Sequence, residues 1–142
     1  MTTEPRMVNR RPHGTPLRQA LTHAAGLAAT LIVPVWVETA IRPSPNATEG
    51  RVMVALLALF VAPLATLGFL AGARTARKPR PAGQPARRLS VSALTGAGSA
   101  VILYGIVFLG QGLVGADLLY LLFTPLLAAV AARMVAGSDR SA

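Results

Sequence analysis

Residues Arg74 to Arg88, with the sequence RTARKPRPAGQPARR, form a basic, proline-rich stretch that decides the fold. Six of the 14 Lys and Arg residues lie in these 15 positions, with no acidic residue and with three prolines that prevent a continuous helix. Such a segment stays in water, extended and mobile. It is flanked on both sides by uncharged runs of about 20 residues, the length that crosses the hydrocarbon core of a bilayer. The sequence therefore predicts an integral membrane protein.

The composition supports one membrane domain and excludes several kinds of chemistry. Of the 142 residues, 53% are hydrophobic and 13% are charged, which is more apolar than a soluble domain usually is. The net charge of +9 lies beside the apolar runs and is not interleaved with aromatic residues, so we expect no nucleic-acid partner. The absence of cysteine excludes disulfides, thiolate catalysis and cysteine-ligated metal centres. With two histidines in addition, we expect no metal and no cofactor.

Four apolar runs predict four transmembrane helices, at about 19–37, 52–73, 89–109 and 114–135. The first run follows a basic tail, 1–18, which we expect to be disordered. A basic tail before an apolar run also resembles a secretory signal, but Glu38 would occupy position minus three of the one plausible cleavage site, so we expect a retained helix. The glycines around Gln111 provide the turn between the last two helices, and a short tail, 137–142, follows the fourth.

The distribution of Lys and Arg predicts the orientation of these helices. Twelve basic residues lie in the N-terminal tail, the loop 74–88 and the C-terminal end, against two, Arg42 and Arg51, on the other side. By the positive-inside rule, both termini and the loop 74–88 face the cytoplasm. The predicted fold class is an all-α membrane protein, a four-helix transmembrane bundle. Richness in Ala, Gly, Pro and Arg, with a single lysine, indicates a GC-rich bacterial genome and hence a multi-pass protein of the bacterial plasma membrane.

Small residues mark the faces through which these helices are expected to pack. Helices in lipid associate by close backbone approach, so small residues four apart indicate contact faces. Gly68 and Gly72 form a GxxxG motif in the second span. The third span carries small residues on two roughly opposite faces, Ser92, Gly96 and Ser99 on one, Gly98 and Gly105 on the other. We therefore predict that the third helix is the most enclosed of the four or that one of its faces forms a subunit interface.

Few polar residues are candidates for a transport pathway, because the middle of every span lacks ionisable groups. The candidates that lie in or beside the predicted spans are His23, Glu38, Gln111 and Asp117. Glu38 and Asp117 fall at the outer rim, where caps or surface acids are the favoured interpretation. His23 lies about 7.5 Å along the helix from Arg18 and has the chemistry to relay protons or to ligate haem, but a lone histidine there is more often a hydrogen-bonded packing residue.

The basic loop is the binding element that the sequence supports best. Each Lys or Arg near an anionic leaflet contributes about 1 kcal/mol to its attraction, so we expect the loop to contact acidic lipids or a partner. The residues concerned are Arg74, Arg77, Lys78, Arg80, Arg87 and Arg88. The competing interpretation is that these charges only set the topology.

These observations favour a non-catalytic accessory or scaffolding subunit that packs against another membrane protein or against copies of itself. No serine, histidine and acid are placed to form a hydrolase site, and we expect no enzyme activity. A small oligomeric transporter or channel is the alternative, because glycine, serine and backbone groups can line a pore. A weaker alternative is a component of envelope or lipid metabolism whose catalytic groups lie on another chain.

Overall fold

The computed structural model describes residues 16–76, 85–110 and 116–137, except for the side chains of residues 85, 86, 116 and 117. These residues form four helices: α1 (Pro16–Ile41), α2 (Ala47–Thr75), α3 (Pro85–Leu109) and α4 (Ala116–Gly137). All four helices are long and apolar enough to cross a membrane. The prediction of an all-α, four-helix transmembrane bundle is confirmed, and the chain is a small multi-pass integral membrane protein.

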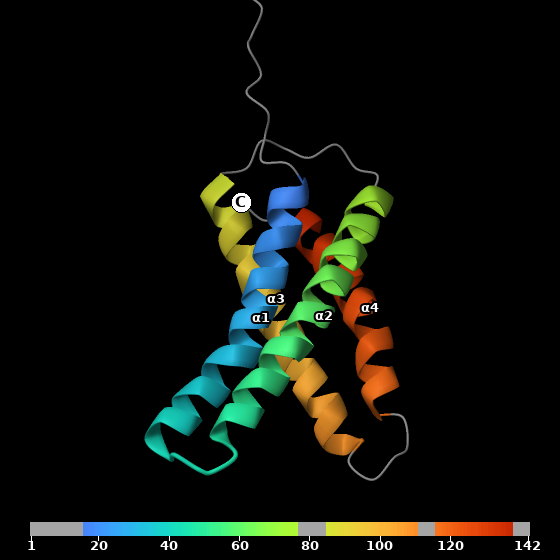
Figure 1. The fold of residues 1–142 in the computed structure, drawn as a ribbon. Helices are drawn as coiled ribbons and strands as arrows, with labels where there is room; N and C mark the ends of the chain where they lie inside the picture. The colour runs from blue at the N-terminus through green and yellow to red at the C-terminus, as the bar shows by residue number, and fades with distance from the viewer. Residues whose placement is uncertain (1–15, 77–84, 111–115, 138–142) are drawn as a thin grey trace, which may run out of the picture.

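The helices run up and down in turn, so the first residue of α1 and the last of α4 lie at the same end of the bundle (Figure 1). We call this the terminal end, and the opposite end the distal end. The main contacts join α1 to α2, α2 to α4, α4 to α3 and α3 to α1, which makes a ring of four helices. Placement of the terminal end in the cytoplasm stays a prediction from the charges.

The helices extend beyond the predicted spans, because hydropathy marks the part of a helix that lies in lipid and not its ends. α1 begins at Pro16 and ends at Ile41, and α2 begins five residues before the predicted span. α3 begins at Pro85, and proline is favoured in the first turn of a helix because its φ is already helical. As a result, Arg74, Arg87 and Arg88 lie on helices, whereas the sequence placed them in an extended loop.

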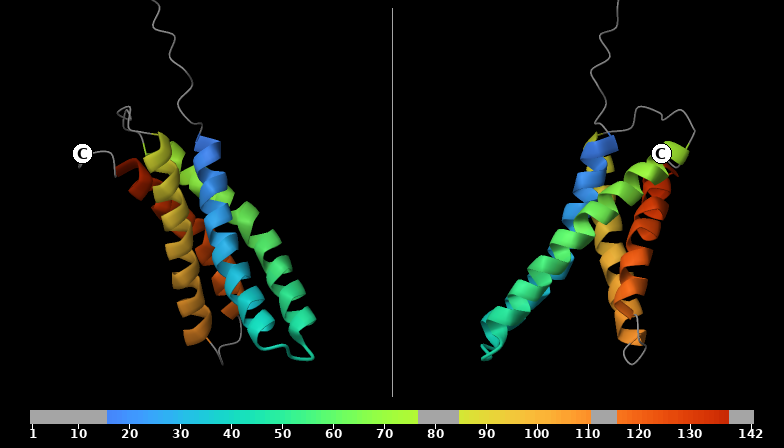
Figure 2. Two further views of the ribbon diagram at one scale, coloured as in Figure 1. Left: turned by 90° about the vertical axis from the view of Figure 1, so that its left-hand side faces the viewer. Right: turned by 45° about the vertical axis from the view of Figure 1, so that its right-hand side comes forward.

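In the α1–α2 hairpin, the buried residues lie toward the terminal end of the bundle. In α1 the last buried residue is Leu31, and in α2 the first is Ala58, so the distal half of this hairpin has no buried residue. Over this half the α1–α2 hairpin diverges from the α3–α4 hairpin (Figures 1 and 2). The core itself is built mostly from small residues such as Ala20, Ala65 and Ala100, which allow the helices to approach closely.

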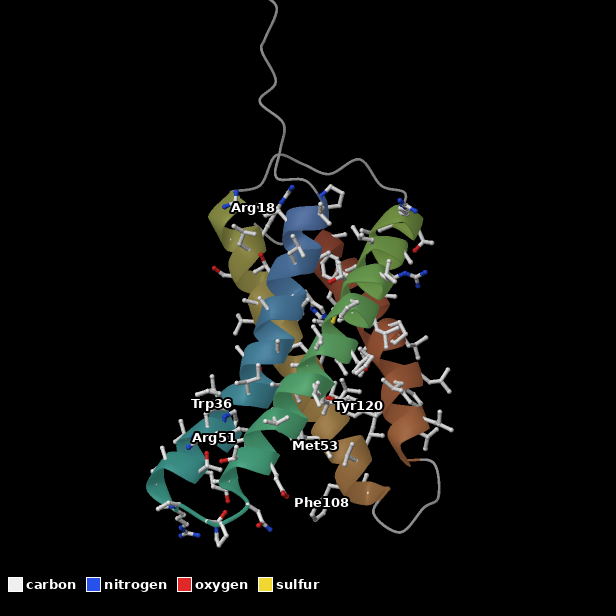
Figure 3. All side chains as sticks on the ribbon, in the orientation of Figure 1. Arg18, Trp36, Arg51, Met53, Phe108 and Tyr120 are labelled. Carbon is white, nitrogen blue, oxygen red and sulfur yellow. The ribbon has the colours of Figure 1, made fainter. Side chains whose placement is uncertain are left out.

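The distal end of the α1–α2 hairpin is held together by Arg51, although it is separate from the core. The Arg51 guanidinium lies 5.3 Å from the centre of the Trp36 ring, and its Nε donates a hydrogen bond of 2.8 Å to the Thr39 hydroxyl (Figure 3). Tryptophan and arginine both favour the interface between lipid and water, where the ring meets apolar chains and the charge meets water. This cluster therefore anchors the hairpin at the distal membrane surface.

Candidate functional site

Among the described ionisable side chains, His23 is the most completely buried, and it lies at the crossing of α1 and α3. It has no exposed surface. Two glycines bring the helices together around it: a Cβ built on Gly96 would contact the backbone carbonyl oxygen of His23, and one built on Gly26 would come within 2.6 Å of the Ala93 carbonyl oxygen. Only glycine leaves room for the neighbouring backbone at these two positions, so α1 and α3 can cross closely. The imidazole of His23 is enclosed at this crossing.

A chain of hydrogen bonds fixes the proton on this imidazole. His23 Nδ1 lies 3.2 Å from the Thr95 hydroxyl oxygen. The Thr95 hydroxyl donates to the Ser92 carbonyl oxygen at 2.9 Å, so its oxygen is left to accept the bond from the ring. When the Thr95 hydroxyl donates in this way, Nδ1 carries the ring proton and Nε2 is an acceptor. Nε2 is buried and has no hydrogen-bond partner among the described residues.

The surroundings of His23 limit what the unpartnered Nε2 can do. The centre of the Phe69 ring, on α2, lies 5.2 Å from the centre of the imidazole. The imidazole is therefore covered by α2 as well as by α3. An unprotonated Nε2 can accept a hydrogen bond, take up a proton or coordinate a metal ion. Within residues 16–76, 85–110 and 116–137, however, no three potential metal-binding side chains gather at one place. A metal ion held at this nitrogen would therefore need ligands from elsewhere.

Of the other residues of the predicted polar pathway, the structure describes the side chain of Glu38, which lies far from His23. Glu38 is exposed in the last turn of α1, 15 residues or about 22 Å further along the helix. Asp117 lies in the first turn of α4, near the distal end, and its side chain falls outside the described residues. Gln111 also falls outside them. Among the described residues, His23 thus has a polar neighbour in Thr95, on the face of α3 that includes Ser92, and none in Glu38.

The glycines and serines singled out as packing residues divide into two groups. In the first group, a Cβ on Gly68 would contact the backbone of Pro125, and one on Gly72 would contact the backbone of Ala129, so α2 and α4 cross closely. Ser92, Gly96 and Ser99 are buried on the face of α3 toward α1. In the second group, Gly98 and Gly105 are exposed, and a Cβ on either would meet nothing within 4 Å.

The basic residues predicted to contact lipid or a partner are described only in part. Arg74 and Arg87 are exposed at the terminal end, and Arg88 is half-buried. Arg77, Lys78 and Arg80 lie outside the described residues. Arg133, near the end of α4, donates a long hydrogen bond of 3.5 Å to the Thr75 hydroxyl of α2. Arg74, Arg87, Arg88 and Arg133 therefore all lie at the terminal end of the bundle.

Two residues that contribute to the packing of the bundle were not anticipated from the sequence. Tyr120 is only 4% exposed, and its hydroxyl has no hydrogen-bond partner among the described residues. Gly26 was not singled out, although it provides half of the α1–α3 crossing. The small residues beside it, Ala24 and Ala25, were the sequence feature that could have indicated a close helix contact. They do not indicate which helix packs there.

The chain was compared with known proteins at three levels. No family model matches it, no curated protein matches it and no solved structure matches it.

Proposed function

We propose that this chain is a non-catalytic accessory or scaffolding subunit that binds another membrane chain through the outward face of α3. The observation that carries this proposal is the open space over Gly98 and Gly105. They are seven residues apart, and two turns of helix put them on the same face. Val101 and Ile102, between them, are 65% and 52% exposed. Two glycines beside large aliphatic side chains form the shallow surface against which a second helix can pack closely.

The comparison with the other face of α3 supports this assignment. On that face, Gly96 has the backbone of α1 directly against it. In a membrane helix, close backbone contact is the principal advantage of glycine, since glycine otherwise lowers helix stability. Gly98 and Gly105 have no such contact with the described part of the chain. A partner helix, from another protein or from a second copy, would provide it.

Cysteine crosslinking in native membranes tests the proposal, because the chain has no cysteine of its own. Gly105→Cys, labelled with a photoreactive benzophenone maleimide, is expected to form a crosslinked product on irradiation, because the benzophenone inserts into C–H bonds of a partner helix whether or not that partner carries a cysteine. Phe60→Cys, on an exposed part of α2, is the matched control and is expected to crosslink little. Mass spectrometry of the product identifies the partner. Equal crosslinking at both positions, or none at Gly105, would contradict the assignment of the α3 face.

A transporter or channel is a second candidate, supported by the buried His23 with its unpartnered Nε2. Ionisable residues inside a membrane are costly and often mark a path for protons or ions. If this function holds, proton flux into liposomes containing the wild-type protein exceeds that of empty liposomes, and His23→Phe abolishes the difference. Flux equal to that of empty liposomes would remove this candidate.

A further inference from the structure

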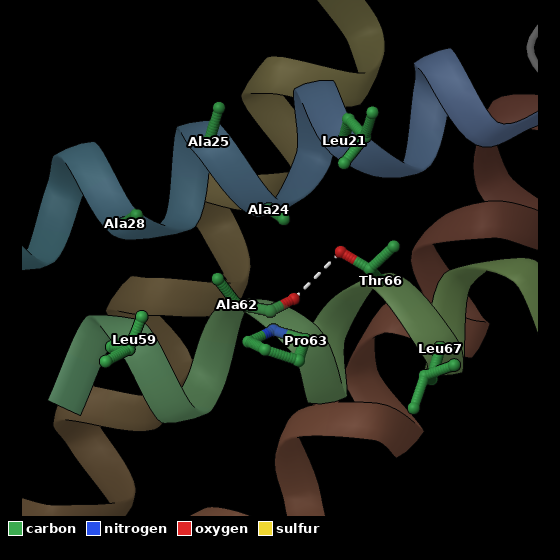
Figure 4. Close-up of a pocket in the computed structure, with 9 residues that line it drawn as sticks. All are labelled: Leu21, Ala24, Ala25, Ala28, Leu59, Ala62, Pro63, Thr66 and Leu67. Atoms are coloured by element: carbon green, nitrogen blue, oxygen red, sulfur yellow. Dashed lines mark hydrogen bonds between the residues drawn. The ribbon is translucent and has the colours of Figure 1, made fainter. Parts of the chain in front are cut away.

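A groove lies between α1 and α2 on the outside of the bundle, in the half near the terminal end. It has a volume of about 620 Å³ and is lined by Leu21, Ala24, Ala25, Ala28, Leu59, Ala62, Pro63, Thr66 and Leu67 (Figure 4). Small residues form its floor where the two helices meet. Exposed side chains form its rims, Leu21 and Ala25 on α1 and Pro63 and Leu67 on α2.

The groove offers only apolar groups to an occupant. Thr66 carries the one hydroxyl among the lining residues, and this hydroxyl donates a 2.8 Å hydrogen bond to the Ala62 carbonyl oxygen within α2 (Figure 4). The volume falls in the range of sites that bind small ligands. An aliphatic chain lying along the two helices matches both the lining and the elongated form.

Both rims of the groove continue into an arginine at the terminal end. Arg18 precedes Ala25 by seven residues on α1, and Arg74 follows Leu67 by seven residues on α2, so each arginine shares a helix face with its rim. Both arginines are exposed. They lie about 4.5 Å beyond Leu21 and about 10 Å beyond Leu67 along their helices, which is within reach of long side chains that extend toward the membrane surface.

We propose that this groove binds an anionic phospholipid, with one acyl chain between α1 and α2 and the phosphate between Arg18 and Arg74. The charge at the end of the groove selects the occupant. A partner helix would fill an apolar groove equally well, but it would not require a cation on each rim at the level of the headgroups. An anionic lipid satisfies both features. The proposal is independent of the function proposed above, since it concerns α1 and α2 and not the outward face of α3.

Native mass spectrometry of the purified full chain, titrated with phosphatidylglycerol or with phosphatidylcholine of the same acyl chains, tests the proposal. The wild-type protein is expected to bind phosphatidylglycerol more tightly. Arg18→Gln and Arg74→Gln are each expected to weaken that binding about fivefold and to weaken the binding of phosphatidylcholine less, because its choline cation offsets the attraction of its phosphate. Arg42→Gln, which removes an exposed arginine at the distal end, is the charge control and is expected to change neither affinity.

A second variant tests the groove itself. Ala25→Phe adds a bulky side chain at the exposed rim of the groove and is expected to weaken the binding of both lipids, whereas Ala40→Phe, at an exposed distal position of α1, is not. Circular dichroism of each variant verifies that the helices are intact. Equal affinity of the wild type for both lipids, or binding that Ala25→Phe does not change, would overturn the proposal. Loss of an oligomer in Ala25→Phe, with lipid binding unchanged, would assign the groove to a partner helix instead.

Discussion

Two glycines of α3, Gly96 and Gly98, provide a matched test of how the bundle is packed. They are two residues apart in one helix, and the structure gives them opposite surroundings. A Cβ on Gly96 would contact the His23 carbonyl oxygen and would lie 3.0 Å from the Leu27 backbone nitrogen. A Cβ on Gly98 would meet nothing within 4 Å. The same substitution, glycine to alanine, is therefore expected to have opposite effects at the two positions.

The expected magnitudes follow from three contributions. Alanine in place of glycine stabilises a helix interior by about 1 kcal/mol, and this gain applies at both positions. At Gly96 the methyl group meets backbone, which no rotamer change relieves, so α1 and α3 must separate at an overpacking cost of about 1–3 kcal/mol. The separation also lengthens the 3.2 Å contact between His23 and Thr95. Loss of that hydrogen bond costs a further ~1 kcal/mol.

Reversible unfolding in mixed micelles, with SDS added to a mild detergent and helicity followed by circular dichroism, measures the difference. We expect Gly96→Ala to lower the free energy of unfolding by about 1–3 kcal/mol. Gly98→Ala is expected to leave it unchanged or to raise it by up to about 1 kcal/mol. Equal effects of the two substitutions, or a stabilising Gly96→Ala, would refute the close crossing of α1 and α3.

Three further substitutions test separate contacts. Gly72→Val places a side chain against the Ala129 backbone and is expected to cost about 1–3 kcal/mol in the same unfolding assay, so a neutral result would contradict the close α2–α4 crossing. Thr95→Val removes the partner of His23 Nδ1 and is expected to destabilise the bundle by about 1–3 kcal/mol, whereas Thr95→Ser keeps the hydroxyl and is expected to retain most of the stability. Arg51→Gln breaks the contact with the single tryptophan and is expected to shift its fluorescence emission. An unchanged spectrum would show that the two side chains do not meet.

The membrane-spanning helices were predictable because burial in lipid imposes a property that each residue carries by itself. The 22 uncharged residues from Val52 to Ala73 satisfy that requirement without reference to any other part of the chain. Helix ends depend instead on local backbone chemistry. Pro85 begins α3 because its φ suits the first turn of a helix, although the composition of the residues around it predicts a polar loop.

The surroundings of His23 were not predictable, because they depend on which helices meet. Thr95 lies 72 residues away in sequence, and its selection as the partner of the imidazole follows from the crossing of α1 and α3. Small residues indicate that a close crossing exists, but Gly96 and Gly98 look alike in sequence. Only the arrangement in space distinguishes the glycine that contacts α1 from the glycine that faces outward. The burial of Tyr120 was not predictable for the same reason, since it depends on the neighbours of this residue in space.

The measurement that tests the proposed function most directly is native mass spectrometry of the C-terminally tagged chain, purified from its native membranes in mild detergent. We predict an assembly of fixed stoichiometry, with a partner protein or with further copies, that Gly98→Leu dissociates while the variant chain keeps its helicity. A wild-type chain that is recovered only in single copies would contradict the account. So would an assembly that Gly98→Leu leaves intact.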